Sequence, residues 1–171
     1  KDINFILNYE NSNSLNTNLI QGDYILLNFD EKWISRNYID TYEKIEPTSS
    51  QFINFINELS QKQIVVIVNG FIDNPILNSI DLRNKNKIIV KDKINIFEFQ
   101  SLIKHANYLI TCHGAPSHIA SNYNVKIIDI IDKSEEKFFK SYNFHFSNKV
   151  QLHRENFVNL SKKILSSINI L

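Results

Sequence analysis

The segment Cys112–His118 holds the side chains best suited to chemistry in this sequence. It leads from an apolar run into a helical pattern through Gly114, and Pro116 suits a first helical turn. The start of a helix offers backbone N–H groups and the positive end of a dipole, which together attract phosphate. Ser117 and His118 fall in the same turn and can donate hydrogen bonds to an oxygen-rich ligand. We therefore predict a phosphate-binding loop that includes His113, Gly114, Ser117 and His118.

A turn from strand to helix also requires glycine and proline when no ligand binds, so a purely structural turn is the alternative. The low glycine content favours a site. The chain has three glycines in 171 residues, whereas average usage is about 7%. Each remaining glycine is therefore expected at a position where a side chain does not fit.

Lys32 is a further candidate because its charge could neutralise a diphosphate. A solvated lysine beside a half-buried Trp33 is the alternative. For His113 and His118 the sequence offers no third metal ligand, so no metal site is predicted. Cys112 precedes His113 directly, and adjacent side chains rarely face each other, so we expect a packed thiol and not a nucleophile.

The elements that must position these residues follow an alternating pattern. Uninterrupted apolar runs indicate strands that are buried on both faces, and amphipathic segments between them indicate covering helices. One helix opens with the capping-box pair Thr48 and Gln51. We predict an α/β fold, a Rossmann-like parallel sheet of five to six strands with helices on both faces and the strand ending at Thr111 in the centre. The expected strands are 24–29, 64–68, 87–90, 108–111 and 126–131, and further helices are expected within 75–80, 95–106, 115–123 and 155–168.

Length and composition limit the function classes. At 171 residues the chain has room for about one domain, expected at 22–171 after an Asn- and Ser-rich linker at 1–21. A net charge of +1 gives no general attraction to nucleic acid. The basic segment 83–93 is interpreted as a solvated loop, with nucleic-acid or membrane contact as the alternative. The sequence shows no P-loop and no G-x-G-x-x-G, which disfavours ATPases and dinucleotide dehydrogenases.

The sequence contains no apolar run long enough for a transmembrane segment. One cysteine and no methionine are present, and no signal-peptide pattern is visible. We expect a cytoplasmic protein without a disulfide framework, and we expect the chain to be part of a longer protein.

Residues 95–128 resemble the donor-binding half of glycosyltransferase family 9, the heptosyltransferases. That family has a helix ending in an alanine-rich turn, a strand, an Asp-Ser/Thr-Gly-x-x-His-x-Ala loop and a second strand, which are matched here by 95–106, 108–111, 112–120 and 125–128. The segment Asn28–Trp33 is similar to the Lys-Trp segment of the family. The resemblance covers roughly residues 22 to 168, and it supports Gly114, His118 and Lys32 as donor-binding residues.

The resemblance implies a glycosyltransferase B-type fold, in which two Rossmann-like domains enclose a cleft. This chain would be the half that binds a nucleotide-diphosphate sugar, without a metal cofactor. The catalytic base of the family lies in the N-terminal half, so no catalytic residue is expected here and the chain is expected to be inactive alone. Its acceptor would be a glycan or lipid-linked molecule in cell-surface polysaccharide or lipopolysaccharide synthesis, with a peripheral place at the inner face of the membrane as a further possibility.

Two other functions remain open. The family's acidic residue before Ser/Thr-Gly is replaced by Cys112 or His113, which favours a noncatalytic binding module on the same fold. A sugar-nucleotide epimerase of B-type fold would also need a diphosphate loop. Binding of nucleotide-sugars would separate the enzyme hypotheses from the noncatalytic module.

Overall fold

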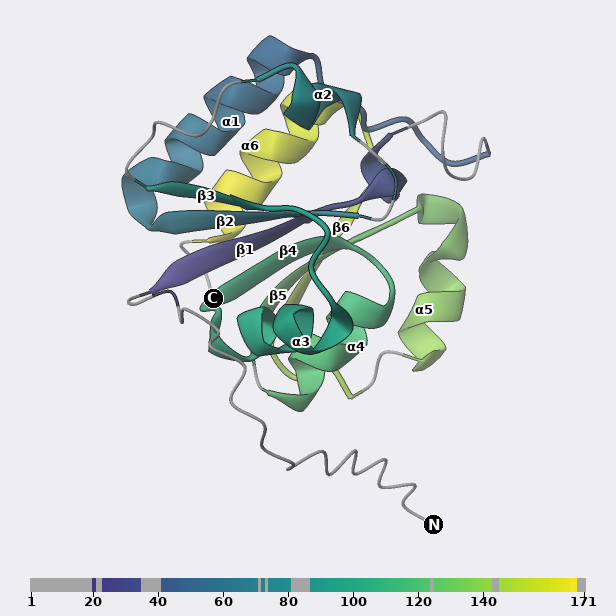
Figure 1. The fold of residues 1–171 in the computed structure, drawn as a ribbon. Coiled ribbons are helices and arrows are strands. Elements are labelled where there is room, and N and C mark those ends of the chain that lie inside the picture. The colour runs from purple at the N-terminus through teal and green to yellow at the C-terminus, as the bar shows by residue number, and fades with distance from the viewer. Residues whose placement is uncertain are drawn as a thin grey trace.

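A parallel six-stranded sheet forms the centre of the protein (Figure 1). The structure is a computed structural model and describes residues 20, 23–34, 41–70, 72, 74–80, 87–123, 125–142 and 145–168. Except for residue 20, the expected linker lies outside these ranges, as do residues 81–86, which include part of the basic segment. The strand order is β3-β2-β1-β4-β5-β6. The strands are β1 (Tyr24–Phe29), β2 (Ile64–Asn69), β3 (Ile88–Lys91), β4 (Tyr108–Cys112), β5 (Lys126–Ile131) and β6 (Lys149–His153).

Helices cover both faces of the sheet. In Figure 1, α1, α2 and α6 lie on one face and α3, α4 and α5 on the other. The predicted α/β class, Rossmann-like sheet and two-sided helical cover are therefore confirmed. The helices are α1 (Ser49–Lys62), α2 (Pro75–Asn78), α3 (Ile96–His105), α4 (Ala115–Asn122), α5 (Glu136–Tyr142) and α6 (Phe157–Ser167), with short 3-10 turns η1 (Glu31–Trp33) and η2 (Lys133–Glu135).

Alternate residues of each strand enter opposite layers of the core. In β1, Ile25 and Leu27 belong to the cluster that contains the apolar faces of α1 and α6. The intervening Leu26 belongs to the cluster that contains Leu102 of α3 and Ala120 of α4. Because both sets are buried, the strand is apolar throughout, which is why its sequence shows a continuous run and no alternation.

Local signals account for the helix starts. Thr48 accepts a hydrogen bond from the Gln51 backbone, and Gln51 accepts one from the Thr48 backbone, which completes the predicted capping box of α1. Asn95 caps α3 by accepting from the N–H groups of Phe97 and Glu98. Both caps satisfy backbone donors that have no partner within the helix.

Two features differ from the sequence expectations. Strand β6 was not individually predicted, because it is short and half-buried along its length, unlike the apolar strands. Trp33 is fully buried and not half-buried. Its ring contacts Phe29 and Phe157 at centroid distances of 5.3 and 6.5 Å. Among the described helices, none combines the length and apolarity that crossing a bilayer requires.

Candidate functional site

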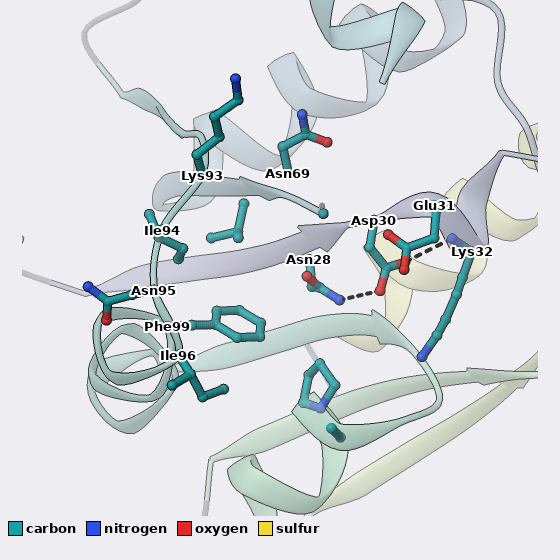
Figure 2. A pocket seen from close by; sticks show the side chains of 14 residues that line it. Asn28, Asp30, Glu31, Lys32, Asn69, Lys93, Ile94, Asn95, Ile96 and Phe99 are labelled. Atoms are coloured by element: carbon teal, nitrogen blue, oxygen red, sulfur yellow. Dashed lines mark hydrogen bonds between the residues drawn. The ribbon is translucent and has the colours of Figure 1, made fainter. Parts of the chain in front are cut away.

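A pocket of about 550 Å³ opens at the carboxyl ends of β1 and β2, beside the start of α4 (Figure 2). Strand β1 pairs with β2 on one side and with β4 on the other. The order of the strands in the sheet therefore reverses at the boundary between β1 and β4. Open α/β sheets bind ligands at such a switch point. The pocket is lined by Asn28, Asp30, Glu31, Lys32, Val68, Asn69, Gly70, Lys93, Ile94, Asn95, Ile96, Phe99, Ala115 and Pro116.

Asn28, near the end of β1, is a buried residue whose side-chain amide lies at the pocket. Its Nδ2 donates to Asp30 Oδ2 at 2.9 Å and to Thr111 Oγ1 at 3.1 Å. Thr111 lies opposite Asn28 in the pairing of β1 with β4. One side chain therefore links the end of β1 to the end of β4, the strand that leads into α4.

Asp30 begins the turn that carries the next two pocket residues. Its Oδ1 accepts from the backbone N–H of Lys32 at 3.1 Å and so caps η1. Burial raises the pKa of Asp30 to about 6, against the opposing effect of the Lys32 charge. This carboxyl, which lines the pocket, therefore changes its charge at a pH of about 6.

Lys32 reaches across from the β1 turn to the loop after β4. Its Nζ donates to the carbonyl oxygen of His113 at 2.9 Å. A Cβ atom at Gly114 would lie 2.3 Å from that Nζ, so the glycine makes room for the ammonium group. Trp33 Nε1 donates to the Asn28 carbonyl at 2.8 Å, which fixes the turn beside Lys32.

The opposite wall of the pocket is apolar. Ile94, Ile96 and Phe99 form this wall, and Figure 2 shows the Phe99 ring pointing into the pocket. Lys93, at the rim, has a φ of 52°, which is uncommon for a residue with a side chain. Backbone conformations of this kind cluster at functional sites. The pocket thus combines an apolar side with a side that carries Lys32 and the start of α4.

The side chains of His113 and Ser117 face a buried carboxylate of β5 and not this pocket. Asp129 is fully buried. Its Oδ2 lies 2.8 Å from His113 Nδ1, and its Oδ1 accepts from Ser117 Oγ at 2.7 Å. The sequence predicts both residues as ligand contacts. The structure instead directs the Ser117 hydroxyl into the core, because the first turn of α4 turns that side towards β5.

His118 also points away from the pocket. It is exposed, and its Nδ1 lies 3.2 Å from His145 Nε2, close enough for one shared hydrogen bond. The ring also contacts Phe146 edge-on at 5.1 Å. Its ring is partly desolvated by its neighbours, and this effect, followed by the charges of His113 and His145, lowers the pKa of His118. The expected contact between His118 and a phosphate is therefore not prepared in this structure.

Cys112 is buried, as expected for a packed thiol. Burial raises its pKa, so the thiolate needed for nucleophilic attack is disfavoured. Within the ranges that the structure describes, no three His, Cys, Asp or Glu side chains are grouped so as to hold a metal ion.

Of the five residues predicted as binding residues, the structure brings Lys32 and Gly114 together at the pocket and turns the side chains of the other three elsewhere. Sequence reasoning missed Asn28, Asp30 and Asp129. Asp129 had a usable signal, because it is a carboxylate with two isoleucines on either side of it in one strand. Such a residue needs buried hydrogen-bond partners.

Comparison with known proteins finds no protein-family profile that matches the chain and no curated protein that matches it. Among solved structures, UDP-GlcNAc 2-epimerase from Methanocaldococcus jannaschii matches 86% of this chain with a TM-score of 0.55 and 15% identity. The wall teichoic acid polymerase TagF aligns with 84% of the chain at a TM-score of 0.44 and 11% identity.

The chain shares the fold of one part of that epimerase. That fold is the glycosyltransferase B-type Rossmann architecture that the family resemblance implied. The matched region is 38% of the epimerase chain, so this chain spans well under two thirds of the length of the protein it matches. At this level of identity the likeness concerns the fold alone.

Proposed function

We propose that this domain binds the diphosphate of a nucleotide-sugar in the pocket between β1, β2 and α4. The observation that carries the proposal is the position of Lys32. Its ammonium group lies over Gly114 at the start of α4 and lines the pocket. A lysine charge and a helix N-terminus at one place are a chemically suitable pair for phosphate oxygens.

The rest of the pocket suits the remainder of such a ligand. Its volume of about 550 Å³ lies in the range typical of small-molecule sites, which combine apolar walls with a few polar groups. The side formed by Ile94, Ile96 and Phe99 can take the flat, weakly polar face of a base. Asp30, Glu31 and Asn69 supply acceptors for hydroxyl groups.

The more specific proposal is the donor-binding half of a glycosyltransferase. In transfer, the bond from the sugar carbon to the diphosphate breaks and a bond to an acceptor hydroxyl oxygen forms. The hydroxyl proton leaves to a base outside this chain, and the nucleoside diphosphate departs. Lys32 and the α4 N-terminus would stabilise the charge that develops on the leaving group. The isolated chain should therefore bind donors without transferring sugar.

The similarity to heptosyltransferases extends the proposal to a cytoplasmic enzyme, free or peripheral at the inner membrane face. A glycan or lipid-linked acceptor would be supplied through a second domain, in cell-surface polysaccharide or lipopolysaccharide synthesis. No resident cofactor or metal is proposed, and no contact with nucleic acid. The nucleotide-sugar itself is the substrate.

Calorimetric titration with UDP, ADP, GDP, CDP and their common sugar derivatives tests binding directly. We expect at least one to bind, and Lys32→Ala to weaken it by about 10- to 100-fold, since a hydrogen bond to a charged group contributes about 1.5–3 kcal/mol. Lys162→Ala removes the same charge from an exposed position on α6 and should leave affinity unchanged. Absence of binding at millimolar ligand would favour a noncatalytic module.

Asp30 supports a second candidate, a nucleotide-sugar epimerase. Its pKa of about 6 suits the removal and return of a proton near neutral pH, which simple donor binding does not require. Incubation of UDP-GlcNAc with the chain, followed by proton NMR, tests this. A new sugar signal that is lost in Asp30→Asn would favour the epimerase, whereas unchanged UDP-GlcNAc would favour the donor-binding domain.

A further inference from the structure

Arg154 is a buried cation that contacts the turn after β1 and is not among the residues that line the pocket. It follows β6 directly, is 9% exposed and donates its backbone N–H to the Ile131 carbonyl at 2.7 Å. The aromatic ring of Tyr42 lies 5.7 Å from the guanidinium carbon. The side chain thus runs between the end of the sheet and the turn that carries Lys32.

The guanidinium group is bonded mainly to backbone. Arg154 Nη2 donates to the carbonyl of Lys32, and Nε donates to the carbonyl of Glu43, both at 2.9 Å. Nη1 lies 3.5 Å from Cys112 Sγ. Burial acts to raise the pKa of Asp132, but hydrogen bonds from Ser134 and Glu43, together with the Arg154 charge, lower it.

Burying a guanidinium group is costly unless its donors are satisfied. A well-packed apolar side chain would fill the same volume without that cost. The guanidinium group presents its N–H donors in a rigid, planar arrangement. It therefore holds two carbonyl oxygens from separate loops at defined positions. One of these carbonyls belongs to the lysine that lies over Gly114.

We propose that Arg154 is a positioning residue for Lys32. The inference rests on the proposed diphosphate site. The backbone of Lys32 is held at its carbonyl by Arg154 and at its N–H by Asp30 Oδ1. With both ends of the residue fixed, the side chain starts from a defined point and its ammonium group meets the His113 carbonyl. Arg154 therefore orders the phosphate-binding position before the ligand binds. The conformational entropy lost on binding is then smaller.

A double-mutant cycle tests this coupling. Arg154→Lys keeps the charge but loses the planar arrangement of donors, and Lys32→Ala removes the group that it positions. The ligand is the nucleoside diphosphate that binds most tightly in the calorimetric series. We expect Arg154→Lys to weaken binding by about 10-fold when Lys32 is present and by less than about twofold in Lys32→Ala. Equal losses in both backgrounds would mean a general structural role and would overturn the proposal.

A second measurement does not depend on a ligand. The ammonium group of Lys32 should give a resolved ¹⁵N NMR signal at low temperature, because its hydrogen bond to the His113 carbonyl slows exchange with water. Arg154→Lys should broaden or remove this signal, while Lys162→Ala should not. If the wild-type chain binds no nucleoside diphosphate, the proposed function fails. The NMR signal then decides the role of Arg154 by itself, and an unchanged signal overturns it.

If Arg154→Lys does not fold, Tyr42→Leu replaces it in both measurements. This change removes the ring beside the guanidinium group and leaves Arg154 in place. A weaker effect in the same direction, again dependent on Lys32, supports the positioning role. Equal effects with and without Lys32 contradict it.

Discussion

Lys32 and Gly114 occupy one small space from two directions, since the Lys32 ammonium nitrogen would lie 2.3 Å from a Cβ atom at position 114. The two residues come from the turns after β1 and β4, which are neighbouring strands. Glycine is thus needed at position 114 because the Lys32 side chain occupies the space that a Cβ atom would fill. The observed position of the ammonium group depends on that atom being absent.

Gly114→Ala should therefore behave as a loss of Lys32. The atom it displaces is the end of a flexible side chain, so the fold should persist and the melting temperature should change by only a few degrees. We expect nucleoside-diphosphate affinity to fall by about 10-fold or more. Adding Lys32→Ala should cost little further affinity. Calorimetry of the single and double variants checks this, and independent, multiplying losses would contradict it.

Asp30 should make stability depend on pH. Its pKa is raised from 3.8 to about 6 in the folded protein, so the folded state binds the proton more tightly than the unfolded chain does. The stabilising contribution is complete below about pH 4 and is lost as the pH rises through about 6. The lost free energy of unfolding is about 3 kcal/mol at most.

Urea unfolding of the wild type and of Asp30→Asn at intervals from pH 4 to pH 8 measures this effect. As the pH rises, the unfolding free energy of the wild type should fall relative to that of Asp30→Asn. A constant difference over this range would show that Asp30 has an ordinary pKa.

Ser117→Ala should affect stability and not binding. The Ser117 hydroxyl donates to the fully buried Asp129, and removal of one hydrogen-bond partner of a buried acceptor costs about 1–3 kcal/mol. Chemical denaturation should show this loss, while nucleoside-diphosphate affinity stays within about twofold. A large loss of affinity with unchanged stability would return Ser117 to the ligand site.

The interaction of His118 with His145 should be visible in the titration of His118. Partial desolvation of its ring, followed by the charges of His113 and His145, lowers the pKa of His118. Replacing His145 by alanine should raise that pKa towards its ordinary value, because it removes a like charge and exposes the ring. Proton NMR of the histidine C–H signals measures this, and His105→Ala, on α3, serves as the matched control. An unchanged or lower pKa would contradict the contact.

The fold could be predicted because its central strands are buried on both faces. Ile64–Val68 is apolar throughout, and Lys126–Ile131 contains four isoleucines beside Lys126 and Asp129. Such runs are typical of strands in covered parallel sheets. Strand β6 was missed because an edge strand of half-buried residues lacks this signal.

The site was only partly predictable. Lys32 and Gly114 each carried a local signal, but their contact depends on the pairing of β1 with β4, which no local pattern contains. Ser117 and His118 were placed in the correct turn, yet the direction of a side chain on a helix depends on how that helix packs. Arg154 gave no signal, because a lone arginine after a short strand is usually exposed.

The strand order has a consequence for motion at the pocket. Its strand residues belong to β1 and β2, each of which is hydrogen-bonded to a strand on both sides. Its rim belongs to turns, including Lys93 and Asn95 before α3. Amides of these strands should exchange with deuterium only when the whole domain opens, whereas rim amides can exchange through local fluctuations. Entry of a ligand and its release can therefore be adjusted by changes in the rim without loosening the surface on which the ligand rests.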